Sequence, residues 1–213
     1  MIRVLIADDH PLVRQGLKYL LSSCADIEFS GEVANGAELI AAMRENSYDV
    51  VLLDLYMPGR NGIELIKQMK SEYPNVPIIV LSTHKEDMFA LRTLKAGASG
   101  YLCKDYAGAN LVDAIRKVSS GGCFISPAVS ELMAKDLHSP IKDLTPHSLL
   151  SDREYQIFML IASGLGPSEI ADKLNLSVKT VSTHKTRIKD KMKFSNTSEI
   201  VRYALKHGLI EQE

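Results

Sequence analysis

The stretch Val50-Val51-Leu52-Leu53-Asp54-Leu55-Tyr56-Met57-Pro58-Gly59 places one carboxylate after four apolar residues and just before a proline-glycine break. Such a run predicts a buried strand that leaves the core at Asp54. An earlier run, Val4-Leu5-Ile6-Ala7, ends in the same way with Asp8 and Asp9. Three acids at two adjacent strand ends would repel each other strongly unless a divalent cation held them together. The two runs therefore predict neighbouring strands with an acidic, cation-binding rim.

Short apolar runs alternate with amphipathic stretches along the first 120 residues. The runs occupy residues 4–7, 27–33, 50–53, 78–81 and 101–103. Between them, apolar residues recur at i, i+3, i+4 and i+7, which is the spacing of a helix with one buried face. Five strands alternating with five helices predict an α/β domain whose parallel sheet is covered on both faces. In such sheets, ligand chemistry lies outside the carboxyl ends of the strands.

Polar side chains follow the carboxyl ends of four of these strands. They are Asp8 and Asp9, Asp54, Ser82 with Thr83, and Lys104. Each alone has a simple structural explanation, because the acids and the hydroxyl could cap the helix that follows and the lysine could lie in solvent. That explanation gives no reason for acid, hydroxyl and ammonium groups to meet at one rim. Their convergence therefore favours a functional site.

The residue types of this rim suit phosphoryl transfer. Asp9 and Asp54, with a backbone carbonyl just after Asp54, could coordinate Mg²⁺, a hard cation that binds carboxylates together with phosphate oxygens. Asp54 could then attack phosphorus and become an acyl phosphate. Lys104 would neutralise a phosphoryl oxygen as a point charge. Ser82 would donate a hydrogen bond to the phosphate and pull its loop toward the site, which can bias a two-state element.

Residues 1–121 resemble a receiver domain of the CheY-like, flavodoxin type, found in two-component response regulators. The resemblance rests on Asp8-Asp9-His10, Asp54 with Met57-Pro58-Gly59, Ser82, Ala96-Gly97-Ala98-Ser99-Gly100-Tyr101 and Lys104. It implies a doubly wound, five-stranded parallel sheet of order 2-1-3-4-5. It also implies that Asp54 is the phosphoacceptor and that Tyr101 is an aromatic switch that moves with the Ser82 loop. The implied Mg²⁺ ligands are Asp8, Asp9, Asp54 and the backbone carbonyl of Tyr56.

One residue departs from the most general receiver pattern. Asp105 follows Lys104 where that pattern has proline. Receivers of the NarL/FixJ type often share this departure, so it narrows the resemblance to that type.

Composition predicts a soluble, cytoplasmic protein. The chain has 213 residues, of which 46% are hydrophobic and 24% charged, as in ordinary globular proteins. Three widely spaced cysteines form no CxxC pair, so neither a disulfide framework nor a zinc site is indicated. Asp8 and Asp9 lie so close to the N-terminus that too few residues precede them for the apolar region of a signal peptide. No apolar run approaches the roughly 18 residues of a membrane-spanning helix.

A second, all-α region follows a linker. Residues 122–147 contain one short helical pattern and then a stretch rich in proline and polar residues, which predicts a linker. Residues 148–213 indicate four helices, the first introduced by Ser151 and Glu154 at the spacing of a capping box. A short helix, a three-residue turn and a basic helix at 178–193 form a helix-turn-helix.

The helix at residues 178–193 carries six basic residues against Asp190 alone. A solvated helix face is the ordinary explanation of such a run, and a polyanionic partner is the functional one. On a 3.6-residue wheel, Val181, Ile188 and Met192 share the side that faces the core. Short hydroxyls beside long cations suit a surface that reads a DNA groove. The candidate base-reading residues are Lys179, Ser182, Thr183 and Thr186, and the candidates nearer to the phosphate backbones are Lys185, Arg187 and Lys189.

Residues 150–154, 169–171 and 179–184 resemble a LuxR-type DNA-binding domain. Together with the receiver, this resemblance implies a phosphorylation-controlled transcriptional regulator, not an enzyme. The regulator would accept a phosphoryl group from a histidine kinase on Asp54 and would bind double-stranded DNA. It would do so as a homodimer whose two copies read two half-sites.

Three other functions are compatible with parts of the sequence. A regulator could act through protein contacts alone, with a helix-turn-helix too weak to bind DNA without a partner. A phosphatase or phosphotransferase could use Asp54 as nucleophile, but no second acid follows at short spacing to act as general acid. A flavodoxin-like cofactor protein fits least, because the rim is acidic where a cofactor phosphate needs donors.

Overall fold

The computed structural model describes residues 1–59, 61–82, 88–104, 107–138 and 145–210. The chain divides into two compact units, Met1–Leu137 and His138–Glu213. Each unit has its own set of buried apolar residues. The domain boundaries placed at residues 121 and 147 from the sequence stay a prediction.

The first unit contains a five-stranded parallel sheet of order β2-β1-β3-β4-β5, which confirms the predicted fold. The strands are β1 (Ile2–Ala7), β2 (Ile27–Val33), β3 (Val50–Asp54), β4 (Ile78–Ser82) and β5 (Gly100–Cys103). All five residues of β3 and of β4 are buried, as expected for strands with helices on both faces. This double burial explains why β3 and β4 appear in the sequence as nearly continuous apolar runs.

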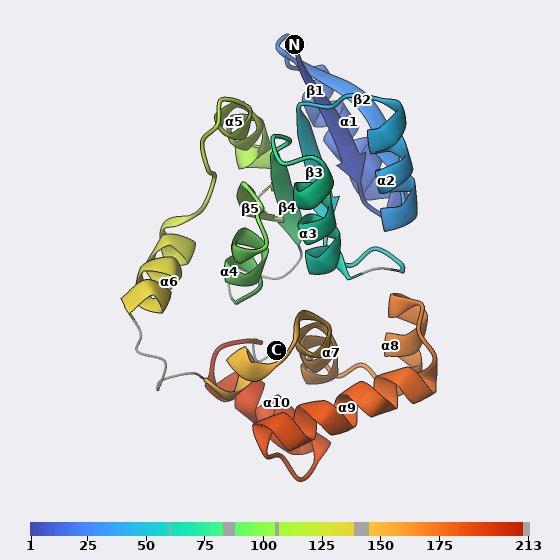
Figure 1. The fold of residues 1–213 in the computed structure, drawn as a ribbon, viewed down its shortest axis with the longest axis vertical. Helices are drawn as coiled ribbons and strands as arrows, with labels where there is room; N and C mark the ends of the chain where they lie inside the picture. Colours follow the sequence, from blue (N-terminus) through green and yellow to red (C-terminus); the bar gives the residue numbers. More distant parts are fainter. Residues whose placement is uncertain (60, 83–87, 105–106, 139–144, 211–213) are drawn as a thin grey trace. The chain divides into compact units, whose positions relative to one another are not determined.

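Helices cover both faces of the sheet (Figure 1). The helices of this unit are α1 (Pro11–Ser22), α2 (Gly36–Glu45), α3 (Gly62–Glu72), α4 (Met88–Lys95), α5 (Ala107–Ser119) and α6 (Pro127–His138). Leu21 of α1 and Ile115 of α5 belong to one core with Leu52 of β3. The helices α2, α3 and α4 lie on the other face (Figure 1). The strands β3, β4 and β5 are therefore shielded from water on both sides, and the strand ends remain as places for polar chemistry.

The carboxyl ends of β1, β3 and β4 lie side by side because these strands pair in register. Ala7 is paired with Leu53, and Leu81 is paired with Asp54. The polar residues that follow Ala7 and Leu81 along the chain therefore leave the sheet at the same edge as Asp54. The register alone thus assembles the polar rim that the sequence predicts.

After α5, the chain returns to the sheet. Phe124 N donates to Ser99 O at 2.9 Å, and Tyr101 N donates to Phe124 O at 3.1 Å. A parallel bridge joins Phe124 to Gly100. This segment therefore lies along the outer edge of β5 before α6 begins.

The second unit is all-α, as predicted. A 3-10 helix, Pro146–Leu149, precedes α7 (Asp152–Ala162), α8 (Pro167–Leu174), α9 (Val178–Met192) and α10 (Thr197–Lys206). His147, in the segment predicted as linker, is buried, and its Nδ1 lies 2.8 Å from the hydroxyl of Tyr203 on α10. The residues just before α7 therefore pack onto this unit. Within the described part of the chain, no helix is both long enough and apolar enough to cross a membrane.

Glu154 connects the start of α7 to the end of α9. Ser151 N donates to Glu154 Oε2 at 2.8 Å, and Glu154 N donates to the Ser151 hydroxyl at 3.3 Å, which closes the predicted capping box. Lys191 Nζ donates to the same Glu154 Oε2 at 2.6 Å. Burial raises the pKa of Glu154, but the hydrogen bonds from Lys191 and Ser151 outweigh burial and hold this pKa below its usual range. A charged pair therefore anchors α9 to α7.

We expect Glu154→Gln to lower the free energy of unfolding of the second unit by about 1–2 kcal/mol at pH 7, because a charge-assisted hydrogen bond is lost. The pKa of Glu154 is lower in the folded state than its ordinary value of 4.5. The stabilisation is therefore present above the ordinary pKa and is lost as the pH falls through the folded-state pKa. The difference between variant and wild type should shrink toward zero as the pH falls below the folded-state pKa. Urea unfolding, followed through NMR signals of α9 amides at several pH values, measures it.

Glu169→Gln is the matched control for this comparison. Gly166 N donates to Glu169 Oε2 at 2.6 Å at the start of α8, but Glu169 is exposed. Its replacement should change stability by less than about 0.5 kcal/mol. An equal loss in both variants would show that the lysine pair of Glu154 adds nothing.

Candidate functional site

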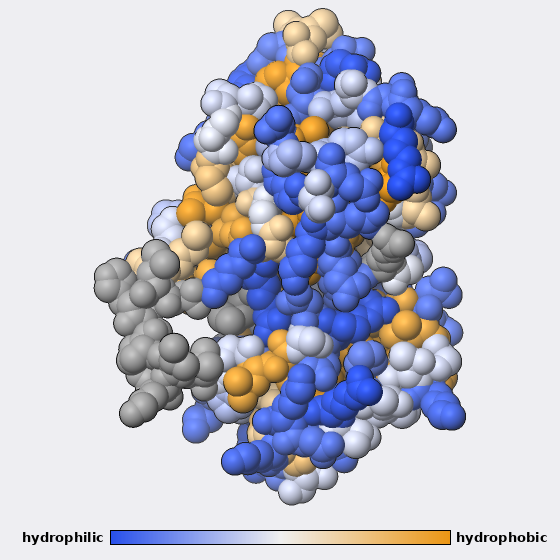
Figure 2. Space-filling model, viewed as in Figure 1, coloured by the Kyte–Doolittle hydropathy of each residue, from blue (hydrophilic) through white to orange (hydrophobic). Residues whose placement is uncertain are grey.

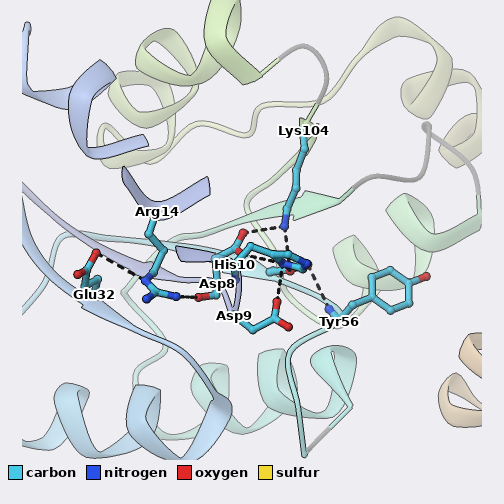
Figure 3. Close-up of polar contacts among 8 residues, drawn as sticks. Asp8, Asp9, His10, Arg14, Glu32, Tyr56 and Lys104 are labelled. Carbon is cyan, nitrogen blue, oxygen red and sulfur yellow. Dashed lines mark hydrogen bonds and ion pairs between the residues drawn. The ribbon is translucent and has the colours of Figure 1, made fainter. Parts of the chain in front are cut away.

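Three carboxylates and one imidazole meet where β1 and β3 end. One ligand atom from each of Asp8, Asp9, His10 and Asp54 lies within 4.8 Å of the corresponding atoms of the other three. Asp8 and Asp54 are buried, and Asp9 is partly exposed. Figure 3 shows the side chains of this cluster pointing toward one another. The structure therefore brings together the three acids predicted from the sequence.

Lys104 reaches into the same cluster from the residue after β5 (Figure 3). Its Nζ lies 2.6 Å from Asp8 Oδ2 and 2.9 Å from Asp54 Oδ2. The Lys104 side chain is only 13% exposed. One cation thus partly neutralises two buried carboxylates, whose mutual repulsion would otherwise be uncompensated.

Burial and charge shift the pKa values of this pair in ways that follow from its geometry. Burial raises the pKa of Asp54 above its ordinary value, although the charge and hydrogen bond of Lys104 oppose this. For Lys104, burial lowers the pKa, but Asp54 and Asp8 outweigh burial and raise it overall. The ammonium group therefore stays charged, and the Asp54 carboxylate pays a desolvation cost that a further cation would offset.

Backbone contacts hold the acids in place. Arg14 Nη1 donates to Asp8 O at 2.7 Å, and His10 N donates to Asp8 Oδ1 at 2.8 Å. Tyr56 N donates to Asp54 Oδ1 at 3.2 Å, which places the backbone of Tyr56 beside that carboxylate. The guanidinium of Arg14 is itself held by Glu32 of β2 at 3.6 Å (Figure 3). The loops after β1 and β3 are therefore tied to the carboxylates that they carry.

His10 also belongs to this cluster, although its sequence context does not predict a role in the site. Its Nδ1 lies 2.8 Å from Asp9 Oδ1 and 3.3 Å from Asp8 Oδ1, and its side chain is 61% exposed. It is the N-cap residue of α1, but its side chain makes no capping hydrogen bond. The available signal was its position directly after two acids, because a tight entry into a helix can bring three successive side chains to one rim.

Ser82 and Tyr101 are buried on neighbouring strands. Ser82 is the last residue of β4 and follows Leu81, the partner of Asp54. Tyr101 lies on β5, where it is paired with Val80. This register places Ser82 at the rim that carries Asp54, while the roles of both residues in switching stay predictions. Thr83 lies outside the described residues, as does Asp105, the departure from the general receiver pattern.

The acidic cluster fits a divalent cation. Asp8 Oδ2 and Asp9 Oδ1 are buried. Lys104 Nζ lies 2.6 Å from the first and His10 Nδ1 lies 2.8 Å from the second, and each carboxylate oxygen has two lone pairs. Carboxylate oxygens with unused lone pairs, gathered within a few ångströms, are ligands that Mg²⁺ prefers. Asp8, Asp9 and Asp54 could therefore hold Mg²⁺.

The second unit carries the predicted helix-turn-helix. Asn175 ends α8 in the left-handed conformation, with φ of 51°, and Ser177 caps α9 by accepting a hydrogen bond from Thr180 N. Val181, Ile188 and Met192 are buried, so the predicted core-facing side of α9 is confirmed. Over α9, the surface seen in Figure 2 is coloured hydrophilic to intermediate. The turn thus presents a polar helix face outward.

The candidate DNA-contacting residues lie on that outward face or at its edges. Lys179, Ser182, Thr183, Thr186 and Arg187 are exposed, while Lys185 and Lys189 are partly buried. The hydroxyl groups of both threonines donate back to their own helix, Thr183 to Lys179 O at 2.9 Å and Thr186 to Ser182 O at 3.2 Å. The role of each residue in DNA binding stays a prediction.

Comparison with known protein families also finds two separate regions in this sequence. Residues 4–116 match the model of the response regulator receiver domain, and residues 148–204 match the bacterial regulatory proteins of the luxR family. The sequence is 38% identical over 213 residues to the response regulator UvrY of Escherichia coli strain K12. That similarity covers 100% of this chain and 98% of UvrY.

Solved structures of RcsB are similar over almost the same length. RcsB from Salmonella enterica serovar Typhimurium, bound to promoter P1flhDC in the presence of the phosphomimetic BeF3−, has a TM-score of 0.68 and 30% sequence identity. The match covers 96% of this chain and 98% of that chain. A structure of two RcsB dimers bound to two parallel DNAs has a TM-score of 0.60 and 32% identity, covering 95% and 96% of the two chains.

We expect Mg²⁺ to raise the melting temperature of the first unit, because binding to the folded acidic cluster stabilises it by mass action. At a concentration ten times the dissociation constant, the gain is about 1.4 kcal/mol. Asp9→Asn should abolish most of this gain, since it removes one anionic ligand. Thermal unfolding with and without Mg²⁺ measures the effect. Asp113→Asn, at an exposed position on α5, is the control and should respond to Mg²⁺ as the wild type does. If Asp9→Asn also responds as the wild type does, Asp9 is not a ligand of the cation.

Proposed function

This chain belongs to the response regulators that combine a receiver domain with a luxR-family DNA-binding domain, and from that premise we propose that Asp54 is its phosphoacceptor. The single observation that carries the proposal is the position of Asp54. Its carboxylate is buried at the end of β3, 2.9 Å from Lys104 Nζ and within the cluster of Asp8, Asp9 and His10. The chain is a regulator and not an enzyme in the usual sense, because the only covalent change that we assign to it is on its own side chain.

The proposed chemistry is attack of an Asp54 carboxylate oxygen on phosphorus. The new oxygen–phosphorus bond forms as the bond between phosphorus and an imidazole nitrogen of a histidine kinase breaks, and that nitrogen takes up a proton. Mg²⁺ held by Asp8, Asp9 and Asp54 would screen the charge of the incoming phosphoryl group from the surrounding acids. The burial of Asp8 and Asp54 limits the access of water to the acyl phosphate that results.

Lys104 has two tasks in this proposal. Before the reaction it pairs with Asp8 and Asp54, as the two short distances indicate. After the reaction Asp54 is no longer a free carboxylate, so the ammonium group can pair with a phosphoryl oxygen. Ser82, at the same rim, would donate a hydrogen bond to the phosphoryl group. Tyr101 on the adjacent strand would respond to the movement of the Ser82 loop.

The proposed output is sequence-specific binding of double-stranded DNA by α9. Its outward face carries cations and small side chains, Ser177 caps its start, and Glu154 holds its end against α7 through Lys191. RcsB binds DNA as dimers in one of the similar structures. We extend that arrangement to this chain as a homodimer on two half-sites, acting in the cytoplasm where the DNA is.

Incubation with Mg²⁺ and a small acyl phosphate should add one phosphoryl group to the wild-type protein, labile to base and located at Asp54. Asp54→Asn should lose this modification, because an amide is not a nucleophile for phosphorus. Asp49→Asn is the control, since Asp49 is an exposed acid just before the other end of β3. Intact-mass measurement and peptide mapping decide the outcome. Normal labelling of Asp54→Asn would refute the assignment of the acceptor.

Lys179 and Lys189 separate base reading from phosphate contact on α9. Lys179 lies in the first turn, the end of a recognition helix that reaches base edges, so Lys179→Ala should change the preferred base at one half-site position, at a cost of about 1–3 kcal/mol. Lys189→Ala should weaken binding to all sequences alike and reduce the salt slope by about one. Binding to a panel of single-base operator variants at several salt concentrations measures both. A uniform loss in both variants would contradict the division of this face.

A further inference from the structure

Two hydroxyl groups on the outward face of α9 are already hydrogen-bonded within the helix. On a 3.6-residue wheel, the arc opposite the buried side spans about 100°. It carries Thr186, Lys179, Asp190, Thr183 and Arg187 in that order. Both threonine hydroxyls donate to carbonyl groups one turn earlier in their own helix, at 2.9 Å for Thr183 and 3.2 Å for Thr186. Their single O–H donors are therefore already used before any ligand arrives.

A threonine whose hydroxyl donates back to its own helix leaves its methyl group free for contact with a ligand. The two heavy atoms on Cβ are an oxygen and a carbon, so a rotamer that turns the oxygen back along the helix leaves the carbon to face elsewhere. Thr183 and Thr186 are both exposed, and they are three residues apart and thus neighbours on the helix surface. They form an apolar patch on a face that composition suggests is polar.

Val178 is a further exposed apolar side chain, at the start of the helix. It is 47% exposed, whereas Val181, Ile188 and Met192 of the same helix are at most 4% exposed. Val178 is the first residue of α9, directly after the Ser177 cap, so it lies at the end of a recognition helix that normally enters the major groove. A β-branched side chain has few rotamers, so little entropy is lost when it is packed against a ligand.

We propose that α9 reads DNA largely by apolar contact with thymine 5-methyl groups, made by Val178, Thr183 and Thr186. This inference rests on the proposed function and names the base chemistry that the helix selects. Thymine alone among the four bases presents a methyl group in the major groove, and apolar side chains are its partners there. Hydrogen bonding by these two threonine hydroxyls would be limited to accepting from an adenine or cytosine amine, because their donors are occupied. The operator half-site therefore contains thymines opposite these three residues.

The test removes single methyl groups from either side of the interface. An operator is first selected from random DNA with the phosphorylated full-length protein, and each thymine in it is then replaced by deoxyuridine, which lacks only the 5-methyl group. Wild-type affinity should fall about four-fold at each contacted thymine, the value of one buried methyl-sized group. Thr183→Ser and Thr186→Ser, which keep the hydroxyl and lose the methyl, should lose a similar factor on the thymine operator. Each of these two variants should also no longer distinguish thymine from deoxyuridine at one position.

Thr183→Val and Thr186→Val are the matched opposite changes, because they keep a methyl and lose the hydroxyl. They should bind the thymine operator within about two-fold of wild type and keep the deoxyuridine effect. Val178→Ala should lose the effect at one further thymine, near the position faced by the start of the helix. Binding to DNA without the operator should be the same in all variants, which shows that the exposed substitutions leave the fold intact.

The outcomes separate this inference from the proposed function. If selection yields no preferred sequence, the proposal of sequence-specific DNA binding fails. If a preferred sequence exists but no deoxyuridine substitution weakens binding, methyl reading is overturned. It is also overturned if the valine variants lose as much affinity as the serine variants, or if the deoxyuridine effect is the same in wild type and in all three sets of variants.

Discussion

The pairing of Lys104 with Asp8 and Asp54 is the interaction on which the rim of the sheet depends. Two carboxylates buried this close together cannot both stay ionised without a cation between them. The lysine supplies that cation from a third strand, so one side chain holds together the ends of β1, β3 and β5. Removing one member of such a group leaves a buried charge without compensation, which is far more costly than losing an exposed pair. A covalent change at Asp54 therefore acts on the charge balance of all three strand ends at once.

The second unit uses a related pair for a different purpose. Lys191 and Glu154 join two helices, and the carboxylate is also part of a capping box, so its hydrogen bonds fix both the start of α7 and the end of α9. Nothing in the proposed chemistry alters this pair. In the first unit, Lys104 can therefore change its partner when Asp54 is modified. In the second unit, the pair of Lys191 and Glu154 keeps α9 in a constant orientation relative to α7.

Much of the fold and part of the site could be predicted from the sequence, for reasons that are physical. Strands buried on both faces need continuous apolar runs, and parallel strands place their carboxyl ends at one edge. The proximity of Asp8, Asp54 and Lys104 could therefore be predicted. The place of His10 could not be predicted, because it depends on the dihedral angles of a single turn. The link between Glu154 and Lys191 spans 37 residues and depends on how the helices pack. The threonine hydroxyls of α9 were expected to face outward, but rotamer choice, which residue type alone does not determine, turns both back onto the helix.

The contact of Phe124 with β5 bears on how the first unit behaves when it is separated from the rest of the chain. β5 is the last strand of the sheet, and a terminal strand offers unpaired amides and carbonyls to any other extended chain. Here Ser99 O and Tyr101 N are occupied by the backbone of Phe124, so the edge is partly closed from within. A fragment cut at residue 121 would keep every predicted site residue of the first unit and lose this cover. Such a fragment would self-associate along β5. Extending it by three residues, to Phe124, would restore the cover of this strand.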